Sequence, residues 1–316
     1  MTLVLAAEMP TAPPTAVRVP AKLLEVTSNP EFSGIVWSAA RRRYLVVTDD
    51  SGRRSEGSNH QPLLLALREG GVLDETPVPI LGIDKLNDPE SICAGPDGTY
   101  FVVTSHSPNR EGKTPPARRQ LLHLRDTKRG LEVIGRADLT RVTGGKGLLE
   151  TAELPADGRI DIEAVTFHDH ALFIGFKSPL TSTGAAAIVR IENPLGVLRE
   201  GKLRSEDLRP FAQLRLCAAV DEQSICEGIS DMMFLPSGEL ILSANSPKGG
   251  PKDHGGALWL VPQPAQPAPV LVRRFSHLKP EGVTLSAKRD ALVIVFDRDR
   301  DEPQWTRLPL PIAPAR

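Results

Sequence analysis

Apolar stretches of about six residues recur in pairs along the chain, and a short polar turn separates the two members of each pair. Two apolar stretches joined by a tight turn predict a β-hairpin. The turns are recognisable by their glycine, proline and polar residues, at 95–98, 236–238 and 286–290. Hairpins, rather than helices, are therefore the expected building units.

The hairpins open with a common phrase, in which an oxygen-bearing residue is followed by a small one. Four copies carry a glutamate and a fifth carries a serine, and these residues are Ser33, Glu90, Glu163, Glu227 and Glu281. The small residues that set the register are Gly34, Ser91, Ala164, Gly228 and Gly282. Repeats of roughly 60 residues that hold several short strands are typical of radial β architectures.

Further apolar strands follow the hairpins and start near residues 62, 119, 185 and 256, and fourth strands are expected within 131–139 and 268–275. Four antiparallel strands make one propeller blade. The last unit is one strand short, and the N-terminal stretch 17–26 can supply it. We predict an all-β β-propeller of five blades over residues 16–316, preceded by an arm at 1–15. Six blades would follow if the interval from Ser91 to Ala164 hid another.

The amino-acid composition limits the classes of binding partner to be expected. The 316 residues include 38 basic and 39 acidic ones, with a formal net charge of -1, so no global field favours nucleic acid or an anionic membrane. No apolar run approaches the roughly 18 residues that a membrane-spanning helix needs. The opening residues are either a flexible arm or the remnant of an export signal. A periplasmic or secreted location is expected in the second case and a cytoplasmic one in the first.

The three cysteines, Cys93, Cys217 and Cys226, form an odd number without a C-x-x-C pair. This pattern suggests neither a disulfide framework nor a cysteine zinc site. Cys93 and Cys226 flank apolar strands and are expected to be small core residues.

The glutamates are expected to meet. In an antiparallel hairpin the start of the first strand and the end of the second lie at the same end. If the first strand of each blade is the innermost, the four glutamates and Ser33 converge on the central axis. Carboxylates brought together raise one another's pKa, so something must neutralise them. A hard divalent cation, with Ca²⁺ preferred, does this with oxygen ligands. The alternatives are shared protons or pairing with Lys177 and Arg298.

A set of polar residues ends the second strands, and it should gather on the same face. From this set, Asp49, Asp50 or Asp297 could act as general base, while His106, Lys177 and Arg298 could stabilise negative charge. Asn245 and Asp297 are candidate metal ligands for lactone hydrolysis. The substrate expected at such a face is a small anionic compound or an ester.

Several short motifs resemble those of known propeller families. The stretches Ser33-Gly34-Ile35 and Thr48-Asp49-Asp50 resemble the bacterial phytase-like esterases. The stretch from Asp161 to Ala164, with the one from Gly175 to Pro179, is similar to an uncharacterised family marked by D-I-E-G and G-L-R-G-P; here lysine replaces the arginine. Asp49-Asp50-Ser51-Gly52 and Glu163 also resemble the calcium-activated nucleotidases, which implies a five-bladed fold with an axial calcium ion held by Glu and Ser.

Three functions are compatible with these observations. The first is calcium-dependent hydrolysis of phosphate or carboxylic esters, in which the metal polarises the reacting oxygen. The second is a non-catalytic binding or scaffold propeller whose metal is structural. The third is a lactonase that resembles the gluconolactonase propellers.

Overall fold

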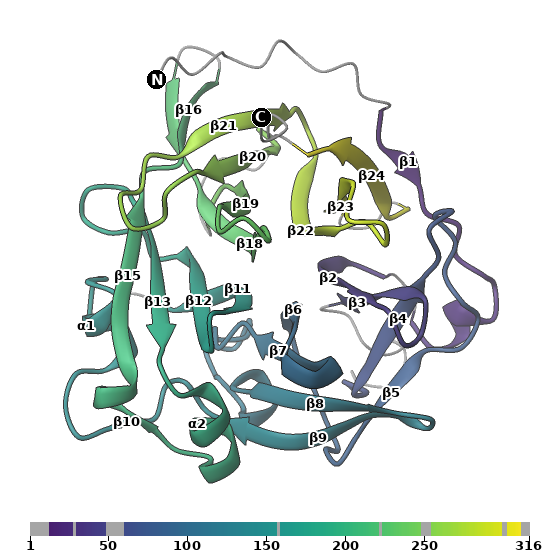
Figure 1. Cartoon of the computed structure of the whole chain (residues 1–316), viewed down its shortest axis with the longest axis horizontal. Helices are drawn as coiled ribbons and strands as arrows, with labels where there is room; N and C mark the ends of the chain where they lie inside the picture. The colour runs from purple at the N-terminus through teal and green to yellow at the C-terminus, as the bar shows by residue number, and fades with distance from the viewer. Residues whose placement is uncertain are drawn as a thin grey trace.

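The computed structural model describes residues 13–27, 30–48, 60–156, 159–220, 223–247, 254–298 and 302–310. Asp49 and Asp50, two of the predicted site residues, lie outside this set. The described strands form antiparallel four-stranded units that follow one another around a central axis (Figure 1). The all-β propeller prediction is confirmed.

The units use consecutive strands almost throughout. Unit 1 consists of β2 (Phe32–Ser38), β3 (Arg43–Thr48), β4 (Leu63–Leu67) and β5 (Val78–Leu81). Unit 2 consists of β6 (Pro89–Ala94), β7 (Thr99–Thr104), β8 (Leu121–Thr127) and β9 (Gly130–Ala137). Unit 3 consists of β11 (Asp161–His168), β12 (Ala171–Ser178), β13 (Ala186–Ile191) and β15 (Leu208–Leu214). Unit 4 consists of β18 (Gly228–Phe234), β19 (Leu240–Asn245), β20 (Gly256–Val261) and β21 (Val270–Phe275). Unit 5 consists of β22 (Lys279–Leu285), β23 (Ala291–Asp297), β24 (Gln304–Pro309) and β1 (Thr15–Ala16).

The N-terminal segment completes the last unit, as the sequence predicts, but through different residues. Strand β1 pairs antiparallel with β24, with Thr15 opposite Trp305. The stretch expected to form this strand begins two residues later and instead contains a short 3-10 helix at Leu23–Glu25. Pairing the first strand with the last closes the ring, because it joins the two ends of the chain within one sheet.

Units 1 and 2 share a continuous eight-stranded sheet. Their outer strands β5 and β9 pair in parallel, with Ile80 opposite Leu131. The number of five blades therefore stays a prediction, because two units are not separate sheets. Short additional elements lie between the strands of the units: β10 (Val142–Thr143), α1 (Leu148–Thr151), α2 (Pro194–Glu200), β14 (Leu203–Arg204), β16 (Cys217–Val220) and β17 (Gln223–Cys226). Of these, α2 packs against β8 and β9 of unit 2.

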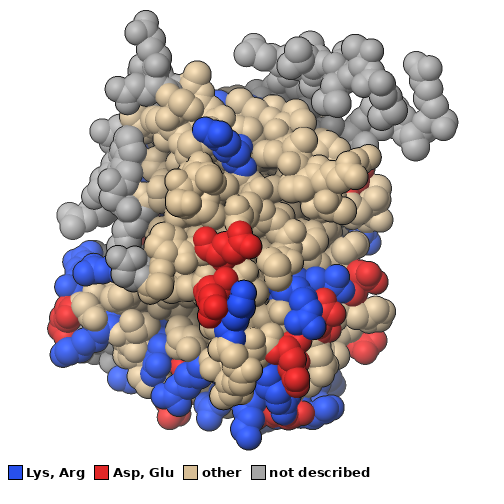
Figure 2. Space-filling model, turned by 90° about the vertical axis from the view of Figure 1, so that its left-hand side faces the viewer, with Lys and Arg blue, Asp and Glu red and all other residues tan. Residues whose placement is uncertain are grey.

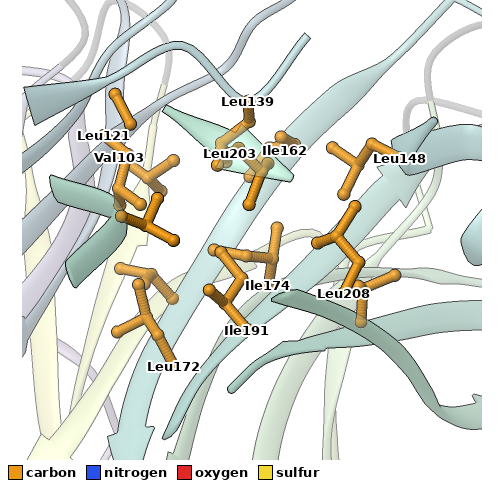
Figure 3. Packing of buried hydrophobic residues seen from close by; sticks show 14 of the residues in the cluster. Val103, Leu121, Leu139, Leu148, Ile162, Leu172, Ile174, Ile191, Leu203 and Leu208 are labelled. Atoms are coloured by element: carbon orange, nitrogen blue, oxygen red, sulfur yellow. The ribbon is translucent and has the colours of Figure 1, made fainter. Parts of the chain in front are cut away.

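The core is divided into hydrophobic clusters that lie between neighbouring units. One such cluster joins units 2 and 3, and Figure 3 shows Val103 and Leu121 beside Leu172 and Ile174. Equivalent clusters occur at the other four junctions. The strands read as almost continuous apolar runs because both faces of each sheet are covered by a neighbour.

The outer surface carries mixed charge. Figure 2 shows Lys and Arg interspersed with Asp and Glu over the lower half of the side that it displays, and no extended region of one sign. This distribution agrees with the nearly balanced composition. None of the described helices has the length and apolar character to span a membrane.

The structure contains a disulfide bond, which the cysteine pattern of the sequence did not predict. Cys217 and Cys226 are cross-strand partners in the β16–β17 hairpin and are joined by a disulfide, nine residues apart in the sequence. Cys226 is therefore not a free core thiol, whereas Cys93 is buried and free as expected. The signal in the sequence was the symmetric spacing around Asp221 and Glu222, which suits a hairpin closed at its base.

Removing this disulfide is expected to lower the free energy of unfolding by about 2 to 3 kcal/mol, because a closed loop of this length restricts the unfolded chain. The measurement is urea unfolding of the Cys217→Ser/Cys226→Ser variant in non-reducing buffer. Wild type treated with dithiothreitol should show the same loss, and Cys93→Ala should respond to the reductant as wild type does. Three titratable thiols in the unreduced wild-type protein would contradict the prediction.

Candidate functional site

The repeated glutamates occupy β-bulges in the innermost strands. The register between the first and second strands shifts at Glu90 in β6, at Glu163 in β11 and at Glu281 in β22. A bulge adds one residue to one strand and re-aims its side chain, and bulges are frequent beside active sites. The repeat in the sequence therefore reflects a repeated distortion of the backbone at the axial end of each unit.

The first unit follows the same plan with serine. Strand β2 shifts register between Phe32 and Ile35, which places Ser33 and Gly34 in the bulge. The small residue is required here, since a Cβ on Gly34 would lie 2.7 Å from Cα of Ser91 in the next unit. A Cβ on Gly282 would likewise lie 3.0 Å from the backbone nitrogen of Ile35. In these two units the small residue lets neighbouring inner strands approach closely.

In the fourth unit, the residue at the repeated position differs from the one predicted by the sequence repeat. Its bulge lies between Ile229 and Asp231, so Ser230 occupies the position of the glutamates. Glu227 precedes β18 by one residue and does not belong to the repeated set. The alignment through Glu227 and Gly228 was wrong by three residues, because another glutamate–glycine pair happens to stand just before the strand. The signal that sequence reasoning missed was an acid, Asp231, inside an otherwise apolar strand.

Lys177 connects two of the bulge glutamates. Its Nζ donates a 2.6 Å hydrogen bond to Oε2 of Glu163 and a 3.4 Å bond to Oε1 of Glu281. Lys177 lies near the end of β12, beside β11, whereas Glu281 belongs to unit 5. We call these three side chains the axial cluster. It contains one of the neutralising cations that the sequence suggested.

Asn245 binds the Glu281 carboxyl of the axial cluster. Its Nδ2 donates to Oε1 of Glu281 at 2.9 Å, and Oγ of Ser243 donates to the backbone oxygen of Glu281 at 3.3 Å. Both residues lie in β19 and are buried. Side chains of units 3 and 4 thus orient Glu281 of unit 5.

Burial and charge act together on the titration of the axial cluster. Burial raises the pKa of Glu163 well above its usual value, and Glu281 and Asp161 raise it further, whereas Lys177 lowers it. Burial alone would lower the pKa of Lys177, but Glu163 and Glu281 outweigh it and raise that pKa. One ammonium shared by two carboxyl groups leaves the site short of positive charge, which favours the protonated form of Glu163.

The structure shows other predicted residues in contacts outside the axial cluster. His106 follows β7 and is buried; its Nδ1 contacts the Thr104 backbone oxygen at 2.8 Å, and its Nε2 accepts from the Leu139 backbone nitrogen at 3.3 Å. Burial lowers the pKa of His106 to about 4. A neutral imidazole with both nitrogens engaged by backbone is not placed to stabilise a substrate oxygen. At the end of β23, Asp297 pairs with Lys279 at 3.4 Å, and Arg298 follows directly.

Glu227 forms a separate buried ion pair. Its side chain is fully buried, Oε1 accepts a 2.6 Å hydrogen bond from Nη1 of Arg274, and Oε2 accepts from Nε1 of Trp259 at 3.4 Å. Burial raises the pKa of Glu227 to about 7, although Arg274 and Trp259 act in the opposite direction. This pair lies next to the disulfide, because Cys226 precedes Glu227.

The donor set does not match a calcium site as arranged. An ammonium already contacts both Glu163 and Glu281, and Glu227 is paired with Arg274. Within the described ranges, no three or more His, Cys, Asp or Glu side chains are grouped so as to hold a metal ion. Calcium therefore stays a prediction from the sequence, and no step proposed below depends on it.

Comparisons with known proteins show the fold. No family model and no curated protein matches the chain. A mannose phosphorylase from Leishmania mexicana, in complex with phosphate ion, is 10% identical with a TM-score of 0.54, over 96% of this chain and 89% of that one. A protein from Leishmania major is 11% identical with a TM-score of 0.51, over 96% and 91%. A gluconolactonase from Xanthomonas campestris is 13% identical with a TM-score of 0.41, over 96% and 99%. The first two likenesses show a shared fold and leave the activity open, and the third is too distant in structure to add to them. The phytase-like and nucleotidase-like resemblances of the motifs remain predictions.

Proposed function

We propose that the chain is a propeller hydrolase that cleaves small carboxylic esters, cyclic esters included, at the axial cluster. The observation that carries this proposal is the contact of one ammonium with two carboxylates at the start of the innermost strands. The side chains are largely buried but keep 14% exposure at Lys177 and 10% at each glutamate, so the axial cluster retains some contact with solvent.

The three groups divide the chemistry of ester hydrolysis among themselves. The Lys177 ammonium stabilises the negative charge that develops on the carbonyl oxygen when water attacks. Glu281, oriented by Asn245, takes the proton of the attacking water. Glu163, whose pKa burial raises well above its usual value, donates a proton to the departing alkoxide. The products are a carboxylic acid and an alcohol.

Charge favours carboxylic esters over phosphoric esters. The axial cluster holds one ammonium, and Asp161 adds a further acid that acts on both Glu163 and Lys177. A site without excess positive charge repels a phosphate dianion but accepts a neutral carbonyl compound. The charge balance therefore favours carboxylic esters among the phosphate and carboxylic esters expected from the sequence. A lactone is a cyclic carboxylic ester, so the lactonase alternative is retained.

The test is a panel of carboxylic esters, lactones and phosphoric esters, assayed with a chelator and again with added Ca²⁺. Carboxylic or cyclic esters should turn over with the chelator present. Glu163→Gln should lower kcat by about 100-fold to 10,000-fold. Asp169→Asn, an exposed change in the β11–β12 turn at the opposite end of the hairpin, should leave it unchanged. Turnover of phosphoric esters alone, and only with Ca²⁺, would overturn the proposal, and so would no turnover at all, which favours a scaffold role for the axial cluster.

A further inference from the structure

A second polar pair crosses the axis next to the axial cluster. Ser91 in β6 and Asp231 in β18 are 0% and 1% exposed, and they come from units 2 and 4. Oγ of Ser91 lies 2.8 Å from Oδ1 of Asp231. A buried carboxyl is costly unless it is hydrogen-bonded, so a pair of this kind in an apolar strand needs an explanation.

Each member of this pair also binds the backbone of a glutamate-bearing strand. The Val165 backbone nitrogen donates to Oγ of Ser91 at 3.1 Å. The Val283 backbone nitrogen donates to Oδ2 of Asp231 at 2.9 Å. Val165 lies two residues after Glu163 in β11, and Val283 lies two residues after Glu281 in β22. A continuous chain of hydrogen bonds therefore runs from β11 to β22 through these two side chains.

We propose that Ser91 and Asp231 are positioning residues, which fix the separation of β11 and β22 so that Glu163 and Glu281 both reach the Nζ atom of Lys177. The proposal rests on the proposed function only in assigning chemistry to the axial cluster; the positioning itself rests on the three hydrogen bonds above.

The physical need for such a link follows from the bulges. Glu163 and Glu281 stand where the ladders to β12 and β23 are interrupted, so those ladders do not fix the residues at these points. A buried and fully satisfied hydrogen-bond network supplies rigidity instead. Burial raises the pKa of Asp231 well above its usual value, and the nearby Glu281 carboxyl adds to the effect. The Asp231 carboxyl thus lies close enough to Glu281 of the axial cluster for the two charges to interact.

The experiment measures the reactivity of Lys177 rather than catalysis. A brief pulse of acetic anhydride at pH 9 is followed by peptide mass spectrometry, with the exposed Lys288 as the internal reference. In wild type, Lys177 should be acetylated far more slowly than Lys288, because Glu163 and Glu281 raise its pKa and its side chain is largely buried. Asp231→Ala should accelerate acetylation of Lys177 by about tenfold or more, since each unit of pKa lost gives tenfold more free amine.

Two further variants make the result specific. Asp231→Asn should restore slow acetylation, because its oxygen can accept from Val283 and its amide can donate to Ser91. Leu124→Ala removes a fully buried side chain in β8, away from the axis, and should lower stability without changing the reactivity of Lys177. If Asp231→Ala does not fold, Ser91→Ala carries the same test with a smaller expected increase.

The outcomes separate the two proposals. Unchanged acetylation of Lys177 in folded Asp231→Ala or Ser91→Ala would overturn the positioning role. An equal increase in Leu124→Ala would also overturn it, because general loss of stability would then be the cause. Absence of ester turnover in wild type refutes the proposed function alone, since the acetylation measurement needs no substrate.

Discussion

Replacing Lys177 by methionine is expected to lower the free energy of unfolding by about 3 to 5 kcal/mol at neutral pH, the usual cost of leaving a buried charge without its partner. Methionine keeps much of the side-chain length but removes the ammonium that contacts Glu163 and Glu281. The two carboxyl groups then face each other across the axis, and the pKa of Glu163 rises further because Lys177 no longer lowers it.

The pH dependence of this loss follows from the sign of the shift. A carboxyl whose pKa is raised in the folded state contributes stability at low pH, and the contribution is lost as the pH rises through the folded pKa. The difference between wild type and Lys177→Met should therefore shrink when urea unfolding is repeated near pH 4.5. The control is Lys288→Met, an exposed change in the turn before β23. A loss below 1 kcal/mol at neutral pH would show that the axial carboxyls do not depend on this lysine.

Glu227 is expected to make the protein less stable as the pH rises from about 4.5 to about 7. The carboxyl is fully buried, and its pKa is raised from 4.5 to about 7. Below about pH 4.5 it is protonated in both the folded and unfolded states. Between the two pKa values only the folded state keeps the proton, so stability falls as the pH increases, and above about pH 7 the loss is complete. The total change is about 3 kcal/mol, on the scale of 1.36 kcal/mol per pKa unit.

Glu227→Gln isolates this effect. Glutamine can still accept the hydrogen bond from Arg274 but cannot ionise, so the stability of the variant should vary less with pH across this window. The measurement is a series of urea unfolding curves from pH 4 to pH 8 for wild type and variant. Glu75→Gln, an exposed change, should follow wild type throughout. A variant curve parallel to that of wild type would mean that Glu227 does not carry the effect.

The fold was predictable because its signals are local and repeated. Apolar pairs with turns at 95–98 and 236–238 indicated hairpins, and the structure has them as β6–β7 and β18–β19. The need for an N-terminal strand followed from the incomplete last unit. Its position was missed because Thr15 and Ala16 carry no apolar pattern, and only the geometry of β24 selects them.

The candidate site was predictable in part. The placement of Glu163, Glu281, Lys177 and Asn245 at one end of the hairpins followed from strand direction, and the structure brings these four together. The position of Glu227 did not follow, because a glutamate–glycine pair before a strand looks the same in sequence whether or not a bulge follows. The link between Ser91 and Asp231 joins units 2 and 4, and no local pattern reports such a contact.

The parallel pairing of β5 with β9 makes the ring mechanically uneven. Main-chain hydrogen bonds at the rim join units 1 and 2 in one sheet, and others link Arg18 to Gly71 and Leu73 between units 5 and 1. The junctions on either side of unit 4 are formed mainly by packed apolar side chains. Shape fluctuations should therefore concentrate on the opposite side of the disc, where unit 4 lies between the units that carry Glu163 and Glu281. The sheet that units 1 and 2 share should accordingly resist deformation more than the two junctions of unit 4.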